Sequence, residues 1–254
     1  MNSLKLLSWN VNGIRAAIKK GALDALNELN ADIVCVQEIK AKPDQIPACL
    51  LEWAGYHPYI CSAARPGYSG VAVFSKIMPQ DVSYGLGEER FDCEGRTVIL
   101  DYPKFRLINC YFPNGGNGPE RLQYKMDFYQ LFQEYANNSD KPLVICGDVN
   151  TAHKEIDLAR PKENQTHTGF LPMERAWIDR FLSDGFVDTF RMFNNEGGHY
   201  SWWDMKTRAR ERDVGWRIDY FFVSQCLKKN VTAAYILPDI MGSDHCPVVL
   251  EMDI

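Results

Sequence analysis

Short apolar and β-branched runs recur along this chain from end to end, and they constrain its fold more than any other feature. They predict strands at 4–9, 32–37, 56–61, 70–75, 96–102, 106–112, 143–148, 217–223, 232–237 and 247–252. Amphipathic segments predict helices at 14–29, 119–136 and 173–183, and the second begins with Pro119 and Glu120, a favoured helix start. Many strands with a few interspersed helices predict an α/β sandwich, with two sheets packed face to face and helices outside.

The composition places the chain among globular proteins. At 254 residues, with 46% hydrophobic and 24% charged residues, it can bury a substantial core. No linker, low-complexity stretch or shift in composition divides it, so we expect one domain over residues 1–254. It has neither an apolar run of about 18 residues nor a signal-peptide pattern. We therefore expect a cytoplasmic protein without a membrane span.

The cysteines and the net charge limit the possible cofactors and partners. None of the eight cysteines forms a C-x-x-C pair, which argues against zinc and a disulfide framework and favours reduced, buried thiols. The formal charge of −5 argues mildly against a polyanionic partner. Acids that bind a cation would change the local sign, however. Nucleic acid therefore requires only local basic clusters, for which Lys19-Lys20 and 207–212 are candidates.

Four of the predicted strands end in polar side chains that can bind a metal ion or a phosphate. They are Asn10 and Asn12 after 4–9, Glu38 after 32–37, Tyr111 and Asn114 at the end of 106–112, and Asp148 and Asn150 at the end of 143–148. Strand carboxyl ends are where open α/β proteins collect their ligand sites. A carboxylate such as Glu38, together with amide oxygens and water, suits Mg²⁺ or Mn²⁺. We therefore expect a divalent metal site at this edge of the sheets.

Asp244 and His245 stand side by side on a Gly-Ser turn before the last apolar run. His245 can donate a hydrogen bond or a proton to a phosphate oxygen if its ring is held in place. Asp219 is the expected partner, since strand alternation puts it on the face of Phe221 and Val223, where an unpaired carboxylate is costly. An aspartate in this position fixes the histidine tautomer and favours the imidazolium.

Asp148 is a candidate base for a water nucleophile, and Asn150 is a candidate to hold that water or the phosphate. A serine nucleophile is not indicated, because the chain has no G-x-S-x-G motif. A P-loop and a G-x-G-x-x-G motif are also absent, and the glycine-rich stretch 114–118 lacks the lysine that a P-loop requires. That stretch is either a substrate-facing loop or an ordinary turn.

Taken together, these residues resemble the exonuclease III / apurinic-apyrimidinic (AP) endonuclease family within the endonuclease/exonuclease/phosphatase superfamily. The resemblance rests on SWNVNGIRA (8–16), VQEIK (36–40), GYSGVAVFSK (67–76), ERFDCEGR (89–96), YFPNG (111–115), CGDVNTAHKEIDL (146–158), GFLPMER (169–175), DVGWRIDYFFVS (213–224) and GSDHCPVVL (242–250). It implies a four-layered α/β sandwich of two packed mixed β-sheets flanked by helices. It also implies Mg²⁺-dependent cleavage of DNA on the 5′ side of abasic sites, with Mn²⁺ as a substitute and some 3′-5′ exonuclease or 3′-phosphodiesterase activity.

The resemblance also implies roles for individual residues. Glu38 matches the principal metal ligand, and Asn10 matches a metal-adjacent amide. The catalytic residues that it implies are Tyr111, Asp148, Asn150, Asp219 and His245. The metal-site residues are Asn10, Glu38, Asp148, Asn150, Asp244 and His245. Phosphate contacts fall to Asn114 and Asn164, and further backbone contacts are expected from Arg15, Lys40, Tyr68 and Arg121.

Trp202, Trp216 and Ile218 match the family's apolar pocket for a base-free sugar. A small slot walled by aromatic rings accepts an extruded deoxyribose and excludes one that still carries its base. Core packing is the alternative for any tryptophan, but the adjacent Trp202 and Trp203 cannot both face one interior. The chain departs from some relatives at Asn12, where they carry an acid. It also departs at Asn117, where they use a basic or bulky residue to wedge the duplex, a function to which Lys206 also corresponds.

We therefore expect a monomeric DNA-repair enzyme that acts on double-stranded DNA with abasic sites or 3′ ends. Two alternatives remain at this point: a phosphatase or phospholipase of the same superfamily, and a nucleic-acid binder without turnover. The sequence also leaves open whether one or two metal ions bind and whether Asp148 or another group is the general base.

Overall fold

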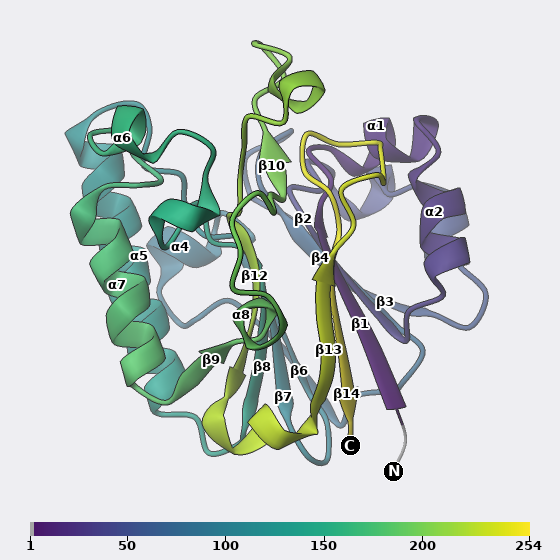
Figure 1. The fold of residues 1–254 in the computed structure, drawn as a ribbon. Helices are drawn as coiled ribbons and strands as arrows, with labels where there is room; N and C mark the ends of the chain where they lie inside the picture. The colour runs from purple at the N-terminus through teal and green to yellow at the C-terminus, as the bar shows by residue number, and fades with distance from the viewer. Residues whose placement is uncertain (1–2) are drawn as a thin grey trace.

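Two six-stranded sheets packed face to face, with helices on their outer faces, make up the computed structural model, which describes residues 3–254 (Figure 1). The predicted four-layered α/β sandwich is therefore confirmed. The first sheet has the order β13-β14-β1-β2-β4-β3. Its strands are β1 Ser3–Asn10, β2 Ile33–Gln37, β3 His57–Cys61, β4 Val71–Ser75, β13 Val231–Ile236 and β14 Val248–Asp253.

The second sheet has the order β5-β6-β7-β8-β12-β9. Its strands are β5 Asp81–Tyr84, β6 Thr97–Asp101, β7 Arg106–Cys110, β8 Leu143–Asp148, β9 Phe186–Asp188 and β12 Asp219–Ser224. Both sheets are mixed. The pairs β1–β2 and β7–β8 are parallel, and the remaining strand pairs in the two sheets are antiparallel. A separate short ribbon pairs β10 Trp202–Trp203 with β11 Gly215–Trp216.

Three apolar layers hold the sandwich together. Alternate residues of both sheets, such as Leu6, Val73, Val144 and Phe221, meet in the layer between the sheets. The outer face of the first sheet packs against α1 Ile14–Lys19, α2 Ala22–Leu29 and the segment around α3 Ala48–Leu51. The outer face of the second sheet packs against aromatic side chains of α5 Pro119–Asn137 and α7 Pro172–Ser183. The short helices are α4 Glu89–Asp92, α6 Pro161–Asn164, α8 Phe190–Phe193 and the 3₁₀ turns η1 Pro43–Gln45, η2 Glu155–Asp157, η3 Ala209–Arg212 and η4 Gln225–Asn230.

The structure departs from the predicted elements in three ways, one of which is that the short helices α3, α4, α6 and α8 were not predicted. The segment 14–29 forms two helices, because Lys20 and Gly21 interrupt it and Gly21 adopts a left-handed φ of 88°. The sequence patterns also missed β5, β9, β10 and β11. β5 is an edge strand with mostly exposed side chains, and the other three are only two or three residues long, so none shows a recognisable alternation.

Within residues 3–254, no helix combines the length and the apolar character that crossing a bilayer requires.

Candidate active site

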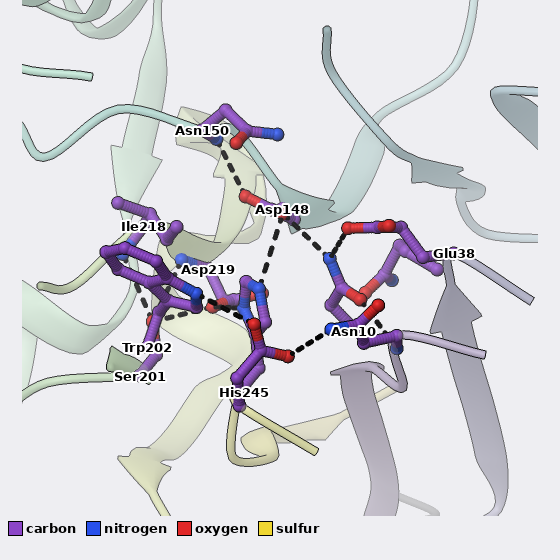
Figure 2. Close-up of polar contacts among 12 residues, drawn as sticks. Asn10, Glu38, Asp148, Asn150, Ser201, Trp202, Ile218, Asp219 and His245 are labelled. Atoms are coloured by element: carbon purple, nitrogen blue, oxygen red, sulfur yellow. Dashed lines mark hydrogen bonds and ion pairs between the residues drawn. The ribbon is translucent and has the colours of Figure 1, made fainter. Parts of the chain in front are cut away.

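Strands β1, β2 and β8 deliver polar side chains to the same end of the sandwich, where the turn before β14 adds a histidine (Figure 2). Ligand atoms of Glu38, Asp148 and His245 all lie within 4.8 Å of one another. These residues come from both sheets and from opposite ends of the sequence. The convergence of Glu38 and His245, on which the sequence-based hypothesis depends, is therefore present in the structure.

Asn10, the last residue of β1, joins the two acids of this cluster. Its Nδ2 donates to Glu38 Oε1 at 2.8 Å and to Asp148 Oδ2 at 2.9 Å, while its Oδ1 accepts the backbone N–H of Asn12 at 3.0 Å. The amide nitrogen, not the oxygen, thus faces the carboxylates. Asn10 thus links the carboxyl groups of Glu38 and Asp148, which come from different sheets.

Glu38 is held in an unusual backbone conformation and remains ionised. Its φ of 51° lies in the left-handed region, so the extended backbone of β2 ends just before it, at Gln37. Lys40 Nζ lies 2.8 Å from Glu38 Oε2. Burial acts to raise the pKa of Glu38, but the Lys40 charge and the hydrogen bonds from Asn10 and Lys40 outweigh it and hold that pKa below its usual value.

Asp148 is the buried acid at the end of β8. The preceding Gly147 has a φ of 138°, and a Cβ there would lie 1.8 Å from the Cys110 carbonyl oxygen, so only glycine permits this approach of β7 and β8. Burial raises the pKa of Asp148 to about 7, with a further contribution from the charges of Asp219 and Glu38. This carboxyl group can therefore exchange a proton near neutral pH.

Asp219, the first residue of β12, holds the ring of His245. Its Oδ2 lies 2.8 Å from His245 Nδ1 and also accepts Ser201 Oγ at 2.6 Å. His245 Nε2 then faces the cluster, 3.8 Å from Asp148 Oδ2. Burial acts against protonation, but the charge and hydrogen bond of Asp219 and the nearby carboxylates raise the pKa of His245 to about 10. The imidazolium is thus the form presented at neutral pH.

Asn150 lies beyond Asp148 in a left-handed conformation with φ 57°. Its backbone N–H donates to Asp148 Oδ1 at 2.8 Å, and its Nδ2 donates to the Phe112 carbonyl at 2.9 Å. Its Oδ1 accepts Asn114 Nδ2 at 3.1 Å, which brings the 113–118 loop to the site.

Burial, followed by the negative charges of Glu38 and Asp148, raises the pKa of Tyr111 well above its usual value. That phenol therefore remains a neutral donor.

Asp244 lies beside the cluster but faces another group of residues. Its Oδ1 accepts Asn12 Nδ2 at 2.9 Å, and its Oδ2 accepts the indole N–H of Trp202 at 3.1 Å. Asn12 Oδ1 in turn accepts Lys40 Nζ, which is also paired with Glu38. Asp244 thus connects a tryptophan through Asn12 and Lys40 to the acid cluster.

An apolar cluster of side chains adjoins His245. Trp202 and Trp216 pack against the buried cluster of Ala152, Leu158, Phe170 and Ile218. The rings of Trp202 and Trp216 meet edge to face with centroids 6.2 Å apart, and the Trp202 ring lies 6.4 Å from that of His245. Trp203 points elsewhere and packs with Tyr200 and Cys246, as expected for neighbours on a strand.

A model of the Endonuclease/Exonuclease/phosphatase family matches residues 7–245. The chain belongs to this family. It is 46% identical to an exodeoxyribonuclease of Bacillus subtilis, over 99% of this chain and 100% of that protein. It is 41% identical to the DNA repair nuclease APEX1 of Danio rerio, over 98% of this chain and 82% of that protein.

Solved structures agree with the sequence comparison. An AP endonuclease from Archaeoglobus fulgidus superposes with a TM-score of 0.90 at 30% identity, covering 99% of this chain and 100% of that one. Members of this family depend on divalent metal ions. The cluster fits such an ion, because Glu38 and Asp148 offer the hard carboxylate oxygens that Mg²⁺ and Mn²⁺ prefer.

The residues that the family resemblance predicts to contact DNA do not form a single group in the structure. Tyr68 and Arg121 line a cavity of about 430 Å³ that also includes Arg65 and Asn117, and Tyr68 Oη accepts Arg121 Nη2 at 2.7 Å. Arg15 lies near Lys40, with its Nη2 at 3.5 Å from the Lys40 carbonyl.

Asn164 lies at the end of α6, and its amide donates to the Arg160 carbonyl at 2.8 Å. Across residues 3–254, no side-chain hydrogen bond joins Asn164 to the acid cluster.

Three further residues support the site without having been singled out from the sequence. Ser201 donates to Asp219, Arg96 donates to the Tyr111 carbonyl at 2.8 Å, and Lys125 donates to the Asn150 carbonyl at 2.7 Å. Arg96 and Lys125 are fully buried. Charged residues are common in amphipathic segments and at strand starts, so their types and spacing carry no signal that distinguishes them from solvated surface.

Proposed function

We propose that this protein is a DNA-repair phosphodiesterase that uses Mg²⁺ to cleave the DNA backbone 5′ to abasic sites, with additional 3′-5′ exonuclease or 3′-phosphodiesterase activity. One observation carries the proposal: the cluster of Glu38, Asp148 and His245 directly adjoins the apolar cluster that contains Trp202, Trp216 and Ile218. The apolar cluster is the proposed slot for a base-free sugar, and a site for phosphate chemistry beside such a slot fits an abasic nucleotide.

The mechanism assigns the metal ion to Glu38 and Asp148, with Asn10 holding the two acids and Asn150 and Asp244 beside them. When bound there, the ion supplies a Lewis acid for the negative charge of the phosphate. Asp148 is the proposed base that accepts the proton of the attacking water.

His245 is the proposed electrostatic stabiliser of the transition state. With Nδ1 bound to Asp219, its Nε2–H donates to a non-bridging phosphate oxygen as negative charge builds up there. Asn150 and the neutral phenol of Tyr111 contact the same phosphate. Asn114 and Asn164 are proposed to contact neighbouring phosphates.

Substrate selection depends on the slot and on the surrounding basic residues. Trp202, Trp216 and Ile218 are proposed to receive an extruded base-free sugar and to accept a nucleotide that carries its base less readily. Arg15, Lys40, Tyr68 and Arg121 are proposed to contact the duplex backbone, where phosphate contacts position DNA without reading its sequence.

We further propose that residues 1–254 form a single catalytic domain that acts as a monomer in the cytoplasm. Light scattering at assay concentration tests this, since a monomer has a mass of 29.1 kDa and a dimer has twice that mass.

The test of the proposed function is incision of a labelled duplex that carries one abasic-site analogue. We expect a nick on the 5′ side with Mg²⁺, none with EDTA, and none in the matched undamaged duplex. His245→Ala and Asp148→Asn are each expected to lose about 10²-fold or more in rate, since each removes a transition-state stabiliser or base. Undiminished cleavage in EDTA would contradict the metal dependence.

A substrate panel separates this function from the alternatives. Abasic, mismatched, uracil-containing and 3′-blocked duplexes, assayed side by side, measure the balance of endonuclease and 3′-end activities. Faster hydrolysis of inositol phosphates or sphingomyelin than of abasic DNA would favour a phosphatase or phospholipase. Tight binding of abasic DNA without cleavage in Mg²⁺ or Mn²⁺ would favour a non-catalytic binder.

A further inference from the structure

Lys125, in the first half of α5, is a fully buried lysine whose three N–H donors are all used. Its Nζ donates to Glu174 Oε1 at 2.6 Å, to the Asn150 carbonyl at 2.7 Å and to Thr151 Oγ1 at 2.9 Å. Both Lys125 and Glu174 have no exposed side-chain surface. An ammonium group in such a place is costly unless it is fully paired, so its presence calls for a reason beyond packing.

Glu174, in the first turn of α7, holds the segment that precedes that helix. Its Oε1 also accepts Thr168 Oγ1 at 2.8 Å, and its Oε2 accepts the backbone N–H groups of Gly169 and Leu171 at 2.6 and 2.9 Å. A Cβ on Gly169 would lie 3.2 Å from the Trp216 ring and 3.3 Å from the Asn150 carbonyl oxygen. The segment that Glu174 fixes therefore packs against Trp216 of the apolar cluster.

The same pair borders the glycine-rich loop 113–118. A Cβ on Gly115 would lie 2.3 Å from Thr168 Oγ1 and 3.3 Å from Lys125 Cδ. This loop carries Asn114, whose amide donates to Asn150 Oδ1. The loops that carry Asn114, Asn150 and Gly169 thus meet at the ion pair of Lys125 and Glu174.

Asn150 depends on such support because its backbone is left-handed, with φ 57°. A non-glycine residue keeps this conformation only where its surroundings over-determine it. Its N–H and its side chain are held by Asp148, Phe112 and Asn114, and its carbonyl is held by Lys125.

We propose that Lys125 is a positioning residue for the reaction, which acts by fixing the Asn150 carbonyl and, with Glu174, by holding the loops of the phosphate site and the sugar slot in register. This inference rests on the proposed function, because it assigns Lys125 an effect on phosphodiester cleavage through the Asn150 side chain. A purely structural ion pair would instead be replaceable by neutral side chains of similar volume without loss of turnover.

The decisive variant is therefore Lys125→Met/Glu174→Gln, which removes both charges and preserves most of the volume. Lys125→Met alone would leave a buried carboxylate without its cation and is unsuitable. We expect the double variant to fold, judged by circular dichroism and a cooperative melting transition. Its kcat on abasic duplex should fall by about 10²-fold with KM within about threefold, because a small displacement of a positioning group affects the transition state more than binding.

Tyr129→Phe is the matched control on the same helix. Its hydroxyl donates to the Val149 carbonyl at 2.8 Å and lies 2.7 Å from Thr151 Oγ1, so it supports the neighbouring backbone without touching Asn150. We expect Tyr129→Phe to lower the melting temperature and to leave kcat within about threefold, since a buried hydrogen bond lost outside the site affects stability alone.

The outcomes separate this inference from the proposed function. A folded double variant with wild-type kcat overturns the role of Lys125 while wild-type incision of abasic DNA still supports the function. A kcat loss in Tyr129→Phe as large as in the double variant also overturns it, since activity would then follow stability. If Lys125→Met/Glu174→Gln does not fold, Lys125→Gln/Glu174→Gln is judged by the same kcat criterion. If the wild type itself does not cleave abasic DNA, the function fails and the inference fails with it.

Discussion

Replacement of Asp219 by asparagine tests the proposed chemistry most directly, because it preserves shape and removes one charge. In the wild type, burial opposes protonation of His245, but Asp219 and the other carboxylates raise its pKa to about 10. The imidazolium is therefore fully present below that pKa and is lost only as the pH rises through it. In Asp219→Asn the burial remains while the charge and the hydrogen bond of Asp219 are gone, so the pKa of His245 is lower than in the wild type.

The magnitude follows from the contacts. Asp219 Oδ2 accepts His245 Nδ1 at 2.8 Å, and a hydrogen bond to a charged group contributes about 1.5–3 kcal/mol. A loss of about 3 kcal/mol from the transition state corresponds to about 10²-fold in kcat. Because the variant loses its imidazolium at a lower pH than the wild type does, the deficit should grow as the pH rises towards about 9.

Single-turnover cleavage of a labelled abasic duplex at saturating Mg²⁺ measures this deficit. Ser201→Ala is the matched control, since Ser201 Oγ donates to the same Asp219 oxygen at 2.6 Å but its removal leaves the charge in place. We expect Ser201→Ala to lose less than about 10-fold, with the pH dependence of the wild type. An Asp219→Asn enzyme within tenfold of wild type at alkaline pH, or one whose deficit does not change with pH, would refute the reasoning.

Further predictions concern stability, the metal ion and the slot. Arg217 is buried between Asp157 and Asp188, so Arg217→Met should lower the free energy of unfolding by about 3–5 kcal/mol in urea titrations. Addition of Asp188→Asn to that variant should restore part of the loss, and an equal loss in the single and the double variant would contradict this. Burial acts to raise the pKa of Asp157, but Arg217 outweighs it and lowers that pKa to about 2. The free energy of unfolding of wild type should therefore exceed that of Asp157→Asn fully above about pH 4, and the difference should vanish as the pH falls towards 2. Glu38→Gln should raise the Mg²⁺ concentration for half-maximal rate by about 10-fold or more, and an unchanged value would remove Glu38 as a ligand. Trp202→Ala should reduce the preference for abasic over intact duplex by about 10-fold, and an unchanged ratio would argue against the slot.

Much of the site could be predicted because it is built at strand ends. Asn10, Glu38 and Asp148 each follow an apolar run, and parallel pairing of β1 with β2 brings two of those ends together. The position of Asp219 on the face of Phe221 followed from alternation along β12, and it required a buried partner. In the structure that partner is His245.

Other features of the site could not be predicted in the same way. Lys125 lies on an amphipathic helix, where a lysine is typical of the solvated face, yet it is fully buried. The break at Gly21 and the short strands β10 and β11 were missed, because local propensity is weak where a segment is only a few residues long.

The sequence by itself determined the kinds of elements, the faces of the strands and the chemical types gathered at their ends, because these follow from periodicity within one segment. Only the tertiary structure decided which atoms meet: that Asn10 turns its nitrogen to the acids, that Asp244 binds Asn12 and Trp202, and that Lys125 reaches Asn150. These contacts depend on the register and packing of elements far apart in the chain. A local pattern contains no information about them.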